Sequence, residues 1–501
     1  MILLSVILLS VGAAFAVSDD NSTMAVDEAI QDDNALAIDP DDSSLSDDSI
    51  PETQSSVVTK DTFHDYFDES GTLKDDVSSD ELIFEGDFTG LDVSYMTIGK
   101  SIKLSGNNVA LNGVSFAVFA DNVVIDGFNL IHSDYSIFTV YGVSGVTLSN
   151  NLINFKTLEG NEGYAIHADT VCDLKILNNT INYVGNTDGT VVNNAIRVTG
   201  DEDSEITSTN IVVDGNVFNI EIPSVVVGYD PETWATKALS EGIVFYYCDG
   251  VKFTNNRVDL KYNSAKGSYD TIYAVSVRGN AYNFESENPI VSSNVEIFNN
   301  TITAAGHNYI YALFVSAEDF NVSYNVINAT SDVYYANAIT IDGPASEGMI
   351  NNNFIVVNSP KCAYGVYSYQ YNGAIQDISY VNNTIIGNSY AVCGMEIFED
   401  NPYIENNVIS VVGNYSTGIV AGMKKNGTIS NNYIVATGSN NGTDPTGDPL
   451  LPYNSVAVKV KGNTSIRNNR IESTGIGINL VKEGAVTIEN NIIDFNNFGA
   501  V

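Results

Sequence analysis

The side chains best suited to chemistry recur at fixed positions in short, β-branched segments that open with Ala or Gly. The second residue of each segment is Ile, Val or Leu, and the fourth is mostly apolar. Because alternate residues of a β-strand share a face, the third and fifth residues point away from that apolar face. These outward positions predict a ligand-binding column made of His167, Asp169, Arg197, Tyr246, Arg278, Phe314, Asp342, Tyr367 and Tyr369.

The column suits a carbohydrate ligand, because aromatic rings can stack on sugars while polar side chains bind hydroxyl groups. Tyr367 and Tyr369 would present two rings on one face. Tyr is also favoured on ordinary sheet surfaces, where it has no ligand to bind. Both interpretations stay open at this point, and a purely structural protein is a third.

A catalytic interpretation uses part of the same column. Cleavage of a uronate polymer would need a basic residue near carboxylates that can hold calcium, and His167, Asp169, Arg197 and Arg278 provide a crude set. An ordinary mixed polar surface explains the same residues and is favoured, so we assign no catalytic residue and no cofactor. The acidic chain is compatible with Ca²⁺, but no motif specifies a metal site. Tyr229-Asp230-Pro231-Glu232 is similar to an epimerase motif without its histidine, and its Asp-Pro pair is better explained as a turn.

The elements that must position this column follow from a repeated Asn-Asn pair before Ile or Val. The tightest spacings of the pair are 22 to 30 residues, and such self-similarity indicates stacked repeats. An asparagine at the same bend of each coil can donate to one neighbouring coil and accept from the other. We therefore interpret the second asparagine as a structural ladder made of Asn151, Asn179, Asn256, Asn300, Asn353, Asn383, Asn407, Asn432, Asn469 and Asn491.

Short strands that turn once per coil predict an all-β fold, a right-handed parallel β-helix with two visible strands per repeat. Its coils would rise by about 4.8 Å, the spacing between strands. Residues 102–501 are assigned to this solenoid. Residues 60–101 are expected to cap it, with an amphipathic helix over Thr62–Gly71 in which Thr62 is the N-cap.

The N-terminal region predicts export. Residues 1–16 form an apolar run that ends in Ala14-Phe15-Ala16, as in a signal peptide, and the run is shorter than the roughly 20 residues of a membrane span. Residues 17–59 have no Lys or Arg and are rich in Asp and Ser, which predicts a solvated linker. The location expected is extracellular, at the cell surface.

Charge and cysteine content exclude several functions. Lys and Arg total 21 against 62 Asp and Glu, a formal net charge of −41, so nucleic acid and anionic lipid are not expected partners. The four cysteines are far apart, which disfavours a zinc site. Cys362 and Cys393 could pair across neighbouring coils, although burial as small apolar side chains is favoured. N-glycosylation is expected at loop sequons such as Asn414 and Asn441.

The stretch Thr62–Val77, the following Leu82–Phe88 and the Asn-Asn coils resemble the adhesin-like surface proteins of methanogenic archaea. That resemblance implies a pectate-lyase-like β-helix that binds glycans or neighbouring cells without catalysis. Members commonly carry a wall-binding module after the helix, whereas this sequence stops at Val501 within a coil. We therefore expect a truncated solenoid whose anchoring domain is missing. The alternative function is a lyase or glycoside hydrolase acting on uronate-type polymers.

Overall fold

The computed structural model describes residues 54–132, 135–186, 193–201, 204–223, 240–263, 271–279, 291–369, 374–422, 425–438, 455–481, 484–495 and 498–500. The predicted signal peptide, most of the predicted linker and the 229–232 motif lie outside these residues. No helix in the described part is long and apolar enough to span a membrane.

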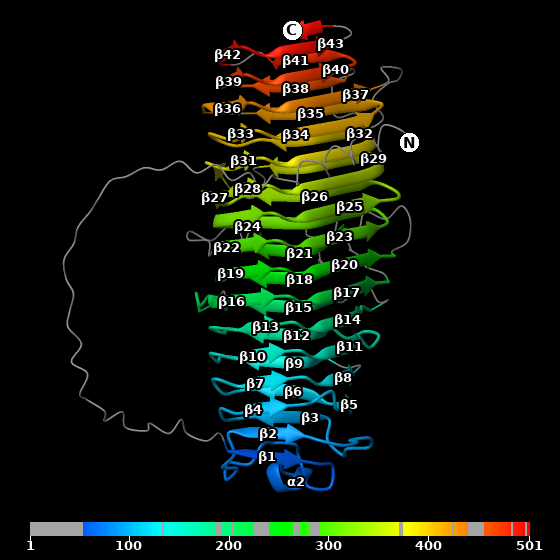
Figure 1. Cartoon of the computed structure of the whole chain (residues 1–501), viewed down its shortest axis with the longest axis vertical. Coiled ribbons are helices and arrows are strands. Elements are labelled where there is room, and N and C mark those ends of the chain that lie inside the picture. Colours follow the sequence, from blue (N-terminus) through cyan, green and yellow to red (C-terminus); the bar gives the residue numbers. More distant parts are fainter. Residues whose placement is uncertain are drawn as a thin grey trace, which may run out of the picture. The chain divides into compact units, whose positions relative to one another are not determined.

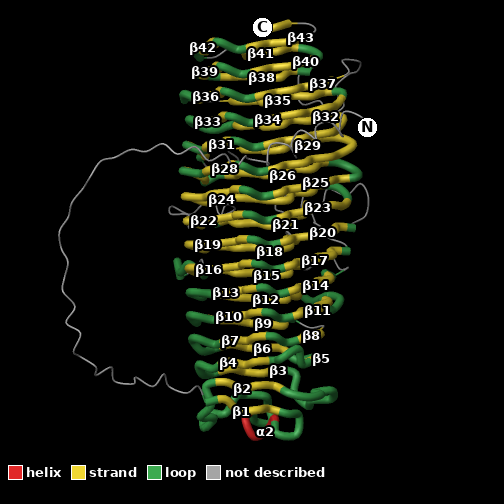
Figure 2. Tube along the Cα trace, viewed as in Figure 1, coloured by secondary structure: helices red, strands yellow, loops and turns green. Residues whose placement is uncertain are grey.

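From β4 onward, the described chain turns through three strands per coil, one on each of three faces (Figures 1 and 2). The first-face strands precede the Asn-Asn corner and are β1 (Ser55–Val58), β2 (Glu81–Phe84), β4 (Lys103–Ser105), β7 (Val124–Asp126), β10 (Thr147–Ser149), β13 (Lys175–Leu177), β16 (Ser208–Asp214), β19 (Cys248–Thr254), β22 (Ser292–Phe298), β27 (Ala345–Ser346), β28 (Met349–Asn351), β30 (Ile375–Gln376), β31 (Ser379–Val381), β33 (Tyr403–Glu405), β36 (Gly427–Ser430), β39 (Thr464–Arg467) and β42 (Val486–Glu489). The second-face strands follow that corner and are β5 (Ala110–Asn112), β8 (Asn129–His132), β11 (Leu152–Lys156), β14 (Thr180–Val184), β17 (Val217–Ile222), β20 (Arg257–Tyr262), β23 (Thr301–Gly306), β25 (Val326–Ser331), β34 (Val408–Gly413), β37 (Tyr433–Gly438), β40 (Arg470–Ser473) and β43 (Ile492–Phe495).

The third face holds the predicted column. Its strands are β3 (Tyr95–Ile98), β6 (Ser115–Val118), β9 (Ser136–Tyr141), β12 (Gly163–Asp169), β15 (Asn193–Thr199), β18 (Ser240–Tyr246), β21 (Thr271–Arg278), β26 (Tyr335–Asp342), β35 (Tyr415–Gly422), β38 (Val456–Lys461), β41 (Ile476–Val481) and β44 (Phe498–Ala500). Three long strands pass through a corner. β24 (Tyr309–Ser323) runs from the third face to the first, whereas β29 (Phe354–Tyr369) and β32 (Thr384–Ile397) run from the second face to the third.

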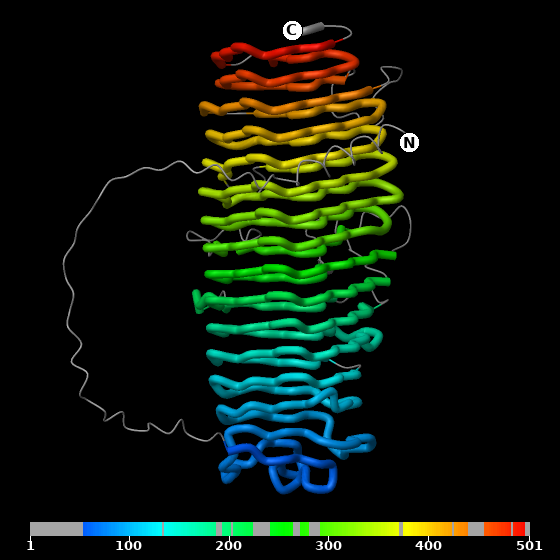
Figure 3. Tube along the Cα trace, in the orientation of Figure 1, coloured from blue at the N-terminus to red at the C-terminus, as the bar shows by residue number. Residues whose placement is uncertain are grey.

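Strands of one face pair in parallel from coil to coil, and Figure 3 shows the trace stepping along the stack one coil at a time. Leu148, for example, pairs with Ile125 of the previous coil and Ile176 of the next. The predicted parallel β-helix is confirmed. The prediction of two strands per repeat was wrong, because the residues after each Asn-Asn pair form a strand of their own.

The Asn-Asn corner separates the first and second faces by a local backbone rule. The first asparagine of the pair takes the left-handed conformation, as at Asn150 and Asn178, which both have a φ of 54°. Asparagine tolerates this region better than most residues. The second asparagine then turns into the interior, where Asn151 and Asn300, for example, are each 1% exposed.

The buried asparagines are bonded into one column along the stack. Each Nδ2 donates to the Oδ1 of the next coil, for example Asn256 to Asn300 at 3.2 Å and Asn300 to Asn325 at 3.0 Å. Each Nδ2 also donates to a carbonyl of the preceding coil, as Asn300 does to Phe253 at 2.8 Å. All ten asparagines of the predicted ladder lie in this column, together with Asn216 and Asn325 from two degenerate repeats.

The N-terminal end of the stack differs from the sequence prediction in two respects. The helix α2 spans only Phe63–Tyr66, and Thr62 makes no side-chain cap hydrogen bond, so the expected Thr62–Gly71 helix is reduced to one turn. Residues 55–58 of the predicted linker form β1, which pairs with β2. The helix ends because Phe67 turns into extended backbone and bridges Leu73, and both Phe63 and Phe67 are fully buried there.

All four cysteines lie within the described residues, and none of them forms a disulfide there. The strand register explains why Cys362 and Cys393 do not pair. Cys362 stands beside Ala391, and Cys393 stands beside Tyr364, two residues further along the strand. Both side chains are buried among aromatic rings, as the interpretation without a disulfide requires.

Candidate functional site

The register of the third face fixes which outward residues are neighbours. One row, which we call the His167 row, runs through consecutive coils as Thr139, His167, Arg197, Val244, Ser276, Phe314, Thr340, Tyr367, Glu396, Val420, Lys459 and Asn479. A second row, the Asp169 row, contains Tyr141, Asp169, Thr199, Tyr246, Arg278 and Ser316. Asp342 stands beside Tyr369 in the same way.

These rows do not form the continuous exposed strip that the alternation rule predicted. In the middle of the stack, Arg278 is 0% exposed and Phe314 is 4% exposed. His167, Asp169, Arg197, Tyr246, Asp342 and Tyr367 are half-buried, and Tyr369 is 40% exposed. The alternation rule gives the direction of a side chain from its own strand, but it carries no information on how much of that side chain is covered. The accessible part of the face is therefore divided between two regions.

A third outward row was missed by sequence reasoning. Strand pairing on the third face skips the small residue that opens each segment, such as Gly242, Ala274 and Ala312. A Cβ on Gly242 would lie 2.6 Å from the carbonyl oxygen of Ala274, so the backbones approach closely at this step. The skipped residue shifts the alternation, and the residues before it reach the outer face at Tyr164, Glu241, Tyr273, Tyr311, Asn337 and Tyr364.

At the centre of the face, Arg278 is enclosed by the side chains that this shift exposes. Its Nη2 lies 2.5 Å from Glu241 Oε1 and donates to the Tyr246 hydroxyl, which in turn donates to Glu241 Oε2 at 2.7 Å. The guanidinium also lies 5.6 Å from the ring centres of both Tyr273 and Phe314. Burial raises the pKa of Tyr246 far above its ordinary value. This cluster is a neutralised, enclosed ion pair whose charged groups bind each other and hold the neighbouring rings in place.

The first accessible region lies on β12 and β15. The His167 ring stacks on the Tyr164 ring at 4.7 Å, and Arg197 stands next to His167 in the following coil. Burial, reinforced by the charge of Arg197, lowers the pKa of His167, so the imidazole is neutral at neutral pH. Arg197 Nε is buried and has no hydrogen-bond partner among the described residues. A neutral base therefore lies beside a cation that retains hydrogen-bonding capacity.

The second accessible region is aromatic and consists of rings on β29 and of Phe398, which directly follows β32. The Tyr367 and Tyr369 rings stack at 5.9 Å with 8° between their planes. Tyr364 contacts Tyr367 at 5.0 Å, and the Phe398 ring meets Tyr369 at 5.9 Å with 81° between the planes. Together these rings form a supported platform with one exposed member, Tyr369.

A buried acid was also missed, because it follows β32 in a corner that has no repeat signature. Glu399 is 1% exposed, and its Oε2 accepts hydrogen bonds from Ser368 and Tyr380 at 2.9 and 2.8 Å. Burial raises the pKa of Glu399 to about 8. The group lies inside the solenoid, so it affects stability and does not belong to the outward rows.

The outward rows include side chains of the kinds that bind metal ions, such as His167 and Asp169. Within the described ranges, no group of three or more His, Cys, Asp or Glu side chains gathers as a metal ion would need. Asp169 accepts a hydrogen bond from the adjacent Thr170 at 2.8 Å and stands beside Thr199. The predicted column thus contains carboxylates, but they are distributed singly along it.

No protein-family model matches the chain. No curated protein matches it either. Among solved structures, it is similar to the A-module of the Azotobacter vinelandii mannuronan C-5 epimerase AlgE6, with 11% identity and a TM-score of 0.38 over 87% of this chain and 98% of that one.

Two further solved structures are similar over most of the chain, again with low identity and a low TM-score. The periplasmic alginate epimerase AlgG shares 9% identity and a TM-score of 0.31 over 87% of this chain and 83% of the other. The Yersinia enterocolitica family 28 exopolygalacturonase shares 9% identity and a TM-score of 0.24 over 89% and 78%. At such low identities and TM-scores these similarities indicate nothing about activity, and the fold rests on the strand pairing described above.

Proposed function

We propose that this protein is an exported, non-catalytic, adhesin-like protein that binds polysaccharides or cell-surface glycans through the third face of its β-helix. The observation that carries the proposal is the Tyr367–Tyr369 platform, which is held by Tyr364 and Phe398 and ends in the exposed ring of Tyr369. A ring fixed by its neighbours loses little freedom when a ligand stacks on it. The net charge of −41 disfavours nucleic acid as a partner.

Binding of the purified chain to a glycan array, followed by titration of each glycan that binds, tests the proposal. Replacing Tyr367 and Tyr369 together with Ala removes two ring contacts of roughly 0.5–1.5 kcal/mol each. The dissociation constant should therefore rise about 5-fold to 150-fold. Tyr433→Ala is the matched control, because Tyr433 is 37% exposed but lies on the second face. Unchanged affinity in the double variant would contradict the proposal.

The second candidate function is cleavage or epimerisation of a uronate polymer, and the His167–Arg197 pair favours it. Arg197 would neutralise the carboxylate of the substrate, and the neutral imidazole of His167 would accept the proton next to that carboxylate. Incubation with uronate polymers, with and without calcium, and detection of unsaturated or epimerised products would reveal such activity. Activity that is lost in Arg197→Ala would replace the first proposal. Arg278→Ala does not test it, because Arg278 is enclosed.

A further inference from the structure

One position at the corner between the second and third faces changes from serine to glycine along the stack. It is occupied in five successive coils by Ser331, Ser359, Ser389, Gly413 and Gly438. A Cβ on Gly413 would lie 2.2 Å from the carbonyl oxygen of Ser389. The close approach of the two backbones therefore excludes a side chain at this step, and the corner is left open where the glycines begin.

The serine hydroxyls at this position differ in their hydrogen bonding. Ser331 Oγ donates to the Asn308 carbonyl at 2.6 Å, and Ser359 Oγ donates to the Tyr334 carbonyl. Ser389 is only 4% exposed, yet its Oγ has no hydrogen-bond partner among the described residues. A buried hydroxyl that is left unsatisfied costs free energy. This one lines the opening, where a ligand can satisfy it.

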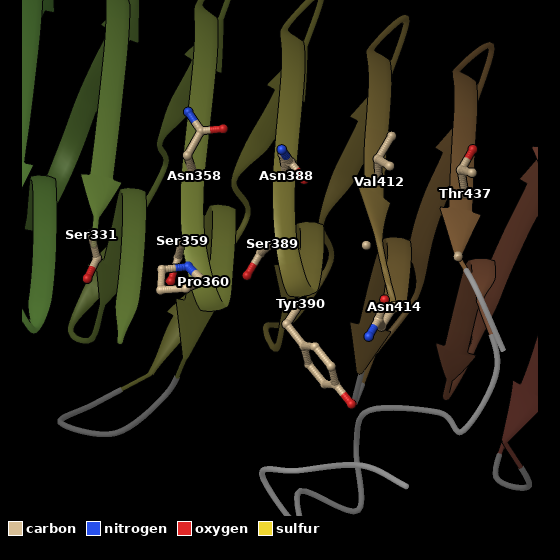
Figure 4. Close-up of a pocket in the computed structure, with 12 residues that line it drawn as sticks. Ser331, Asn358, Ser359, Pro360, Asn388, Ser389, Tyr390, Val412, Asn414 and Thr437 are labelled. Carbon is tan, nitrogen blue, oxygen red and sulfur yellow. The ribbon is translucent and has the colours of Figure 1, made fainter. Parts of the chain in front are cut away.

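The opening is a hollow of about 640 Å³ (Figure 4). Asn358, Asn388, Val412 and Thr437 form a row across its neighbouring strands, and Tyr390 and Asn414 lie beyond the Ser389 position. Every described residue that lines it is uncharged, in a chain whose net charge is −41. With no cation among these described lining residues to offset that charge, the hollow disfavours anionic ligands and suits hydroxyl groups.

We propose that this hollow is a second carbohydrate site, which binds an uncharged, hydroxyl-rich segment of a glycan. The Ser389 hydroxyl and the Asn388 amide bond to sugar hydroxyls, and the half-buried Tyr390 ring provides a stacking surface. Lining groups recur about every 4.8 Å, so an extended glycan along the stack meets similar groups in each coil. The site lies outside the three outward rows and does not depend on the function proposed for them.

The glycan that occupies the hollow has one of two sources. It is either an external polymer or a sugar chain on Asn414 itself, because Asn414-Tyr415-Ser416 is a glycosylation sequon within the lining. Chain produced without glycosylation presents an empty hollow to added oligosaccharides. Glycopeptide mass spectrometry of chain from a glycosylating host, with and without Asn414→Gln, distinguishes the two sources.

Calorimetric titration of the unglycosylated chain with neutral hexasaccharides, and with uronate hexasaccharides as the charged comparison, tests the site. Ser389→Ala should weaken neutral binding roughly 3-fold to 10-fold, the effect of one hydrogen bond. Tyr390→Ala should weaken it more, and Tyr390→Phe should preserve it. Tyr95→Ala is the control at an exposed ring elsewhere, because Tyr95 is 46% exposed and lies on β3 near the N-terminal end of the stack. The Tyr367 and Tyr369 variants should leave this binding unchanged.

The outcomes separate this site from the third face. Neutral binding that is lost with Ser389→Ala and Tyr390→Ala supports the hollow, whatever the third-face variants do. Binding that none of the hollow variants changes, or preference for the uronate ligand at this site, would overturn the proposal. If Tyr390→Ala unfolds the chain, Ser389→Ala and Asn388→Ala remain as substitutions that only shorten a side chain.

Discussion

The asparagine column makes a quantitative prediction at Asn300, a fully buried member in the middle of the stack. Its Nδ2 donates to Phe253 O at 2.8 Å and to Asn325 Oδ1 at 3.0 Å. Its Oδ1 accepts from the backbone N–H of Asn256 at 2.8 Å and from Asn256 Nδ2 at 3.2 Å. Asn300→Ala removes all four contacts from a site that is 1% exposed to bulk water.

The cost follows from the groups that lose their partner. Asn325 Oδ1 still accepts from the backbone N–H of residue 300, so it is not orphaned. The carbonyl of Phe253 and the backbone N–H of Asn256 lose these bonds, and each unsatisfied buried group costs about 1–3 kcal/mol. We therefore expect Asn300→Ala to lower the free energy of unfolding by about 2–6 kcal/mol. Asn491→Ala should cost only about 1 kcal/mol, because Asn491 is partly exposed and water can replace its bonds.

Hydrogen exchange measured by mass spectrometry is the suitable assay, since solenoids can open locally without unfolding as a whole. Peptides that contain β20 and β23 should lose protection in Asn300→Ala and keep it in Asn491→Ala. Urea unfolding of both variants provides the global comparison. Equal destabilisation by the two substitutions, or unchanged protection around Asn300, would refute the claim that the buried asparagine column stabilises the corner between the first and second faces.

Three further predictions concern buried groups. The pKa of Glu399 is raised from 4.5 to about 8, so its contribution to stability is present below pH 4.5 and is lost as the pH rises to 8. In that window the free energy of unfolding should fall by about 1.4 kcal/mol per pH unit because of this group, and Glu399→Gln should remove that slope. Urea unfolding from pH 4 to 9 measures it, and an unchanged slope would contradict this. Arg278→Met should destabilise the chain by about 3–5 kcal/mol because it strands the buried Glu241 charge, and adding Glu241→Gln should recover part of that loss in thermal unfolding; no recovery would contradict the buried pair. In the native chain a maleimide should label the half-buried Cys172 before Cys248, since burial raises the pKa of the Cys248 thiol. Peptide mapping by mass spectrometry at increasing labelling times gives the order, and labelling of Cys248 first would contradict its burial.

The parts of the fold that sequence could predict are those set by a local rule repeated in each coil. The Asn-Asn pair specifies a left-handed residue followed by a buried amide, and this rule places Asn151 and Asn469 in one column although more than three hundred residues separate them. Apolar alternation likewise specifies the inward positions. Both signals depend on residue type and spacing alone.

The parts that could not be predicted depend on contacts between coils. Ala or Gly at the start of each third-face segment was visible, but only the register shows that pairing skips this residue and brings Glu241 to the outer face. Arg278 therefore looked like an exposed cation and is a buried partner of Glu241. The hollow at Ser389 was missed for the same reason, because it depends on a glycine in the following coil.

Glycan binding by the third face is the central claim, and its most direct measurement compares the native chain with the Tyr367→Ala/Tyr369→Ala double variant. Both are titrated with a glycan selected from an array, with Tyr433→Ala as the control. We predict that the native chain and the control bind equally and that the double variant binds about 5-fold to 150-fold more weakly, with no products released. Equal binding by all three proteins, or depolymerisation of the glycan by the native chain, would contradict the account.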